Sequence, residues 1–177
     1  MQYNRMSSGL WAPEKQVLAG RYHAEHFRDG KLIDEWDFDN IITNQGLVTM
    51  LNMMFAGGSV VTNWYLGLFS NNYTPVATDT ASSIVSNAGE FTSYSGGARP
   101  AFTPAAATTT PSINNSASQA SYTFTGAGTL VGGFLISSAT PGSNTGVLYS
   151  AAQFGASKTV ASTDNISITY TTGLSSS

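Results

Sequence analysis

The chain has 177 residues, of which 41% are hydrophobic and 11% aromatic, a composition that suits one packed domain and excludes a disordered protein. Charged residues make up only 10% of it, against about 25% in a typical globular protein. The net charge of -3 excludes the basic surface that nucleic-acid binding requires. The absence of cysteine excludes disulfide bonds and thiolate metal sites.

The charges are concentrated at the beginning of the chain. Five of the seven basic residues and seven of the ten acidic residues precede Asn40. The remainder of the chain carries only Asp79, Glu90, Arg99, Lys158 and Asp164. Because proton transfer and metal binding need ionisable side chains that converge on one pocket, we expect a non-enzymatic protein without metal or cofactor. A weakly charged, polar and apolar surface favours docking to other proteins and self-association.

Residues 1–16 are expected to form an extended N-terminal arm, because they lack periodicity and contain turn formers at Ser7, Ser8, Gly9 and Pro13. The arm is either a frayed terminus or an anchor on a neighbouring subunit, in which Leu10 and Trp11 make the contact. Without a continuous apolar stretch it predicts no signal peptide, and synthesis is expected in the cytoplasm. The longest apolar runs, such as 130–136, are too short to span a bilayer, so no membrane insertion is expected.

A β-hairpin is predicted over residues 17–43. The Asp29-Gly30 pair lies between two strand-like runs, and a tight hairpin turn requires the positive φ that such residues adopt. On the returning strand one face is mostly apolar, while the other carries Glu35, Asp37 and Asp39. We expect this acidic face to be solvated or docked.

One short helix is predicted next, over about residues 45–55, with Asn44 as its N-cap and Gly57-Gly58 at its end. Apolar residues recur at helical spacing, at Leu47, Met50, Leu51 and Met54. We expect this to be the only helix of the protein.

From residue 61 onward the sequence predicts short strands separated by turn residues, at 61–69, 90–94, 98–102, 118–124, 130–137, 146–151, 158–161 and 165–172. The first of these is apolar on both faces, so we expect a central strand with Trp64, Leu66 and Leu68 in the core. Many short strands with a single helix predict one antiparallel β-sandwich or jelly-roll domain over residues 17–177.

Glu90 and Arg99 are isolated charges in a nearly uncharged region, and a lone buried charge is costly. They are either paired beside a loop at a subunit contact or separately solvated. His23 and His26 fall on opposite faces of one predicted strand, so solvated or edge histidines are favoured over a metal-binding pair. The acidic hairpin face is likewise expected to be solvated rather than to bind a cation.

The order of short motifs along the chain resembles that of small structural proteins of tailed bacteriophages. The first motifs are RDGK at 28–31, NIITNQGL at 40–47, WYLGLF at 64–69 and YTP at 73–75. Then follow Glu90, Tyr94, Arg99-Pro100, INNSA at 113–117, VGGFL at 131–135, GVL at 146–148 and DNISI at 164–168. No single motif carries chemistry, so the resemblance rests on their order, which spans nearly the whole folded region.

This resemblance implies a β-sandwich or jelly-roll subunit of the virion, specifically a head decoration or cement protein on the outer capsid surface. Its implied partners are the major capsid protein and copies of itself, in a dimer or trimer, with neither nucleic acid nor membrane bound. The alternative is a tail, adaptor or receptor-binding module, in which exposed aromatic residues such as Tyr73 and Tyr94 would stack on sugars.

Overall fold

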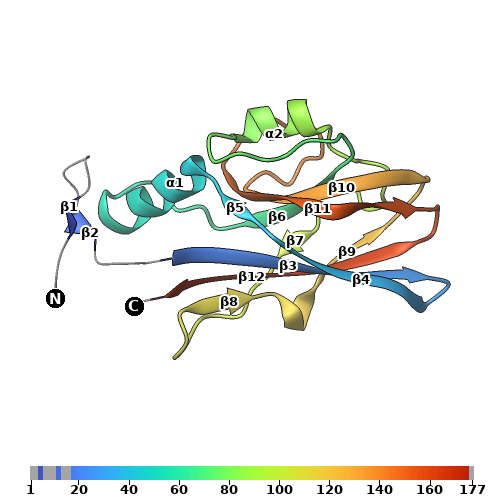
Figure 1. Cartoon of the computed structure of the whole chain (residues 1–177), viewed down its shortest axis with the longest axis horizontal. Coiled ribbons are helices and arrows are strands. Elements are labelled where there is room, and N and C mark those ends of the chain that lie inside the picture. The colour runs from blue at the N-terminus through green and yellow to red at the C-terminus, as the bar shows by residue number, and fades with distance from the viewer. Residues whose placement is uncertain (1–3, 6–10, 13–16, 176–177) are drawn as a thin grey trace.

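The structure, a computed structural model, describes residues 4–5, 11–12 and 17–175. Two antiparallel sheets face each other across a hydrophobic interior (Figure 1). The predicted antiparallel β-sandwich is therefore confirmed. The predicted arm, residues 1–16, lies outside the described residues except for the paired strands β1 (Asn4–Arg5) and β2 (Trp11–Ala12).

The first sheet has the strand order β5-β11-β10-β6-β7. Its long central strands are flanked by short edge strands, each of which pairs with two residues of its neighbour. The members in chain order are β5 (Ile41–Ile42), β6 (Trp64–Phe69), β7 (Ala101–Phe102), β10 (Gly128–Ile136) and β11 (Leu148–Val160).

The second sheet has the order β4-β3-β12-β8, and β9 pairs with the other half of the same edge of β12. The predicted hairpin is confirmed, with Asp29 and Gly30 at positive φ in the turn. The members are β3 (Val17–Arg28), β4 (Lys31–Asp39), β8 (Ser112–Asn114), β9 (Ala120–Thr123) and β12 (Asn165–Ser175). A 3-10 turn, Ser116–Ser118, joins β8 to β9.

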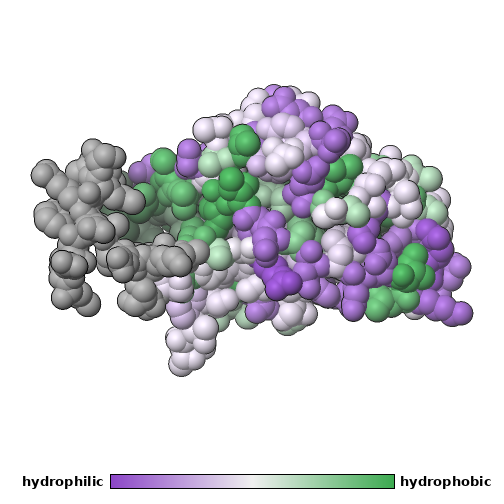
Figure 2. Space-filling view, in the orientation of Figure 1, coloured by the Kyte–Doolittle hydropathy of each residue, from purple (hydrophilic) through white to green (hydrophobic). Residues whose placement is uncertain are grey.

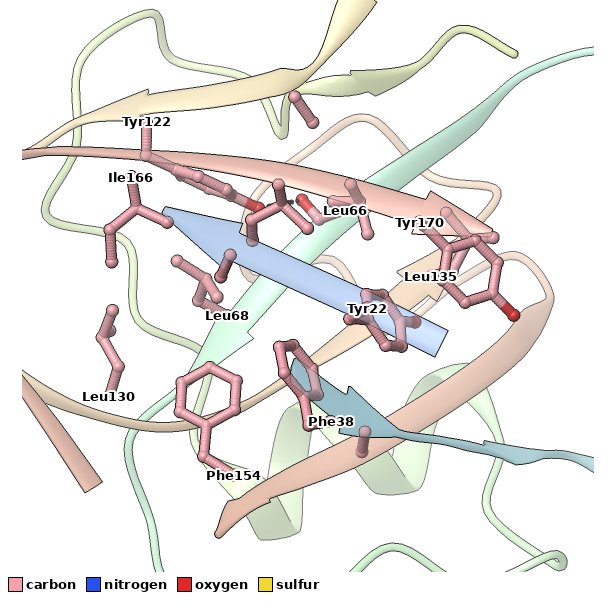
Figure 3. Close-up of a cluster of buried hydrophobic side chains, with 14 of the residues drawn as sticks. Tyr22, Phe38, Leu66, Leu68, Tyr122, Leu130, Leu135, Phe154, Ile166 and Tyr170 are labelled. Carbon is pink, nitrogen blue, oxygen red and sulfur yellow. Dashed lines mark hydrogen bonds between the residues drawn. The ribbon is translucent and has the colours of Figure 1, made fainter. Parts of the chain in front are cut away.

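Strand β6 is the central strand that its sequence predicts. Leu66 and Leu68 are buried between the sheets (Figure 3), whereas Trp64 at the strand's end is only half-buried. Gly67 faces the other way, and a Cβ atom there would lie 2.1 Å from the Phe134 ring. The absence of a side chain at this position therefore permits the close approach of the aromatic ring.

Two α-helices accompany the sheets, so the prediction of a single helix is wrong. Helix α1 (Asn44–Phe55) matches the predicted segment, but its N-cap is Thr43, whose hydroxyl accepts the Gly46 N–H, and not Asn44. The second helix, α2 (Ala81–Ala88), covers the outer face of the first sheet (Figure 1). Its buried residues, Ala81, Ile84 and Ala88, pack against Phe69 and Phe134.

Several predicted strands have different limits in the structure. Residues 90–94 form no strand but only isolated bridges at Glu90 and Tyr94. The segments predicted at 146–151 and 158–161 belong to one strand, β11, whose middle continues through Gly155. A register shift between Leu130 and Gly132 in the pairing with β10 accommodates this length.

Candidate interaction surface

Helix α1 is held firmly at its first turn. The Thr43 hydroxyl donates to the Leu148 carbonyl at 2.6 Å, while the Gln45 side-chain oxygen accepts from the backbone of Leu148 and of Ala81. A Cβ atom on Gly46 would lie 2.8 Å from the Tyr149 carbonyl oxygen, so a residue without a side chain lets the helix begin against β11. These contacts fix the helix direction from one end.

The rest of α1 presents apolar side chains to solvent. Leu51 is 58% exposed, Met54 65% and Phe55 78%. Val48 and Leu47 extend the same face, and Figure 2 shows hydrophobic surface over this helix. A helix of a globular protein normally turns polar residues outward, and a contiguous exposed apolar patch marks an interaction site. We call these five residues the α1 face.

Only one of the four α1 residues that recur at helical spacing packs against the core. Leu47, Leu51 and Met54 are exposed, and only Met50 is half-buried against the core. A signal was present, since apolar residues occupy more of the helix circumference than one buried stripe requires. That signal identifies a helix with two apolar sides.

An apolar pocket of about 340 Å³ opens behind α1, at the end of the sandwich where β3 begins and β12 ends. Met50 and Met53 on α1 form one wall. Three aromatic residues, Trp64, Phe102 and Tyr149, are also among the lining residues. No local sequence pattern marks this pocket, because its walls come from segments distant along the chain.

Glu90 and Arg99 form an ion pair inside the protein. The Arg99 guanidinium donates two hydrogen bonds of 2.7 Å to the Glu90 carboxylate, and both side chains are buried. Arg99 also donates to the carbonyls of Ser138 and Ser143, and Glu90 accepts the Gly142 N–H. Of the two alternatives that the sequence left open, the structure shows pairing and excludes separate solvation. Neither side chain is exposed for direct contact with a partner, so an interface role stays a prediction only for the loop between them.

A second charged cluster was not predicted. Asp164 is buried and accepts hydrogen bonds from His26, Arg28 and the backbone of Ala161. The Arg28 guanidinium, above all, holds the pKa of the Asp164 carboxyl well below its usual range. The expectation of solvated histidines is therefore wrong for His26, whereas His23 is half-exposed beside Asp37. The cluster fastens the β11–β12 turn to β3.

Other predicted site residues fall in different places. Leu10 and the side chain of Trp11 lie outside the described residues. Tyr94 is buried, and Tyr73 is half-buried with its hydroxyl donating to Asp79, so the two do not form the exposed aromatic platform expected for sugar stacking. The acidic hairpin face is exposed as predicted, and its Asp37 pairs with Arg21.

Within the part of the chain that the structure describes, no three His, Cys, Asp or Glu side chains gather in a way that could hold a metal ion. None of the described helices is both long and apolar enough to cross a membrane. No protein-family model matches the chain, and no curated protein matches it. Among the described residues, the α1 face and the apolar pocket behind it are candidate interaction features.

Proposed function

We propose that this chain is a non-enzymatic structural protein of a tailed-phage virion, bound to the outer capsid surface as a decoration or cement protein. The observation that carries the proposal is the α1 face, an exposed apolar surface on a helix whose first turn is hydrogen-bonded to the β-sandwich. Burying such a face against another protein is favourable in proportion to the apolar area removed from water. The resemblance of the motif order to that of phage structural proteins supports the major capsid protein as the partner.

The charged residues support a binding role over a catalytic one. The buried carboxylates of Glu90 and Asp164 are each paired with arginine and satisfied by hydrogen bonds. They hold loops in place inside the sandwich, and neither lines the apolar pocket. Charges that hold loops in place suit a protein that presents a fixed binding surface. A general acid or base in an enzyme must instead be able to reach a substrate.

Stabilisation of the capsid would follow from mass action. A protein that binds only the assembled lattice lowers the free energy of that lattice, by about 2.7 kcal/mol per site when its free concentration is a hundredfold above Kd. Repeated over many sites, this resists internal pressure from packaged DNA. Self-association of the decorating copies would add contacts around the local symmetry axes of the capsid.

Binding to purified heads assembled without the chain tests the proposal. We expect Phe55→Glu, which places a charge on the α1 face, to weaken head binding at least tenfold. Ser82→Glu is the matched control, since Ser82 is an exposed residue on the other helix, and it should bind like the wild type. Equal binding of both variants would remove the α1 face as the capsid contact.

Copy number per particle separates this proposal from a tail or receptor-binding role. A cement protein should approach the number of capsid subunits, whereas a tail component is present in a few to a few tens of copies. Gel densitometry of purified virions measures the number. A low copy number, with loss of cell adsorption on deletion and intact heads, would favour the tail location instead.

A further inference from the structure

The apolar pocket is open and its own chain does not fill it with any described side chain. Its volume of about 340 Å³ falls in the range of sites that bind organic ligands or large side chains. Ser112 and Thr172 are the only residues with hydroxyl groups beside that of Tyr149 among its walls. An occupant of this pocket is therefore aromatic or aliphatic, with at most one or two polar atoms.

The chain enters the sandwich at the rim of this pocket. Leu18 on β3 and Leu174 on β12 face each other in the sheet, and both line the pocket. Strand β3 continues outward to Val17, opposite Ser175. Strand β3 therefore begins and β12 ends at this end of the sandwich (Figure 1).

The N-terminal arm, residues 1–16, carries large apolar side chains, among them Trp11. Trp11 precedes Leu18 by seven positions, so an extended chain carries it up to about 23 to 25 Å from the rim. Because β3 begins at this rim and runs into the sandwich, a return of Trp11 to its own pocket would require a chain reversal within residues 12–16. The pocket of a neighbouring copy requires no such reversal.

We propose that the apolar pocket binds Trp11 of a second copy of this chain, so that copies are joined by exchanged N-terminal arms. The indole ring would pack against Trp64, Phe102 and Tyr149, in the edge-to-face arrangements that aromatic groups prefer. Its N–H would find an acceptor in the Ser112 hydroxyl at the pocket wall. Reciprocal exchange of arms joins two copies in a closed twofold dimer. This contact between copies does not depend on which structure the assembled copies bind.

The absence of cysteine makes disulfide trapping a clean test. One protein carries Ala12→Cys, which keeps Trp11, and the other carries Ala107→Cys, an exposed position at the pocket. When the two are mixed in equal amounts under mild oxidation, we expect a disulfide-linked dimer on a non-reducing gel. Ala156→Cys is the matched control, exposed but away from this pocket, and should cross-link at least tenfold less. Circular dichroism of each variant checks folding.

A second variant asks whether Trp11 is the anchor. Adding Trp11→Ala to the Ala12→Cys protein should reduce cross-linking to the level of the Ala156→Cys control. Unchanged cross-linking in that variant, or equal yields at positions 107 and 156, would overturn the proposal. So would a chain carrying both Ala12→Cys and Ala107→Cys that forms only an intrachain disulfide, because the pocket would then hold its own arm. A tightly bound apolar small molecule in native mass spectra, without cross-linking, would overturn it as well.

Discussion

The hydroxyl of Tyr122 donates a hydrogen bond of 2.6 Å to the backbone carbonyl of Leu66, across the interior between the two sheets (Figure 3). The Leu66 N–H donates to the carbonyl of Pro100, just before β7. In an antiparallel pair the facing residue returns a hydrogen bond, but proline has no N–H. The hydroxyl supplies the missing donor, and burial raises the pKa of Tyr122 well above its ordinary value, so it stays protonated.

Replacing Tyr122 with Phe should therefore leave the Leu66 carbonyl without a donor. We expect a loss of about 1 to 3 kcal/mol in the free energy of unfolding, the cost of an unsatisfied buried polar group. Tyr65→Phe is the control, since Tyr65 is half-buried on β6 beside Leu66. This substitution should change the free energy of unfolding by less than about 0.5 kcal/mol. Denaturant melts measure both, and equal midpoints would contradict the assigned role.

The core position of β6 gives a second prediction. Leu66→Ala should cost about 2 to 5 kcal/mol, because Leu66 is buried between the sheets and truncation leaves a cavity. Asp37→Asn should cost less than about 0.5 kcal/mol, because Asp37 and its partner Arg21 are both exposed. Urea unfolding of the two proteins tests this, and similar midpoints would show that the core lies elsewhere.

The buried pair of Glu90 and Arg99 gives a third prediction, made with a double-mutant cycle. Glu90→Gln leaves the guanidinium buried without its counter-charge, and we expect it to cost about 3 to 5 kcal/mol. Arg99→Met leaves the carboxylate in the same position. The double variant should be destabilised by less than the sum of the two single changes, by at least about 1 kcal/mol. Additive losses would mean that the two side chains act independently.

Low pH should weaken the charged cluster that Asp164 forms with His26 and Arg28. Its pKa is lowered in the folded protein, chiefly by hydrogen bonds from Arg28, relative to about 3.9 in an unfolded chain. The unfolded state therefore binds the proton first, so the stabilisation is present above about pH 4 and is lost as the pH falls through the folded pKa. Denaturant melts at a series of acidic pH values should show that the free energy of unfolding falls less steeply with decreasing pH for Asp164→Asn than for the wild type.

Asp34→Asn is the comparison for this effect. Lys158 lowers the pKa of Asp34 in the same direction, but the Asp34 side chain is 41% exposed and solvent screens the interaction. The loss of unfolding free energy of Asp34→Asn at acidic pH should therefore stay close to that of the wild type. If the wild type and the Asp164→Asn variant lost stability in parallel as the pH fell, the Asp164 carboxylate would not be the titrating group.

Elements set by local chemistry could be predicted from the sequence. The hairpin followed from Asp29-Gly30, and α1 from the capping and spacing around residues 44–55, because these signals act within a few residues. The burial of Leu66 and Leu68 also followed from the pattern of their strand. In each case a pattern among neighbours in sequence was sufficient to predict the element, and distant strands then provide its packing partners.

Helix α2 shows where local reasoning fails. Its residues ASSIVSNA include three serines and two β-branched residues, which are poor helix formers, so the helix depends on packing against the first sheet. Its signals were the reciprocal Thr80-Ser83 capping box and Gly89 at positive φ. For the α1 face the sequence shows only that apolar residues surround much of the helix, and which side is exposed depends on distant strands. The pocket has no local signal, because its walls come from segments distant along the chain.

All five charged residues that follow Asn40 make internal contacts: Asp79 with Tyr73 and Ser83, Glu90 with Arg99, Lys158 with Asp34, and Asp164 with Arg28. The later part of the chain therefore presents few free charges to its surroundings. Salt screens attraction between exposed charges beyond about 10 Å at 0.1 M, but it leaves apolar contacts intact, and sulfate strengthens them. Binding through this weakly charged surface should therefore persist at ionic strengths that dissociate complexes held by charge. A high-salt wash should leave the protein bound to its partner.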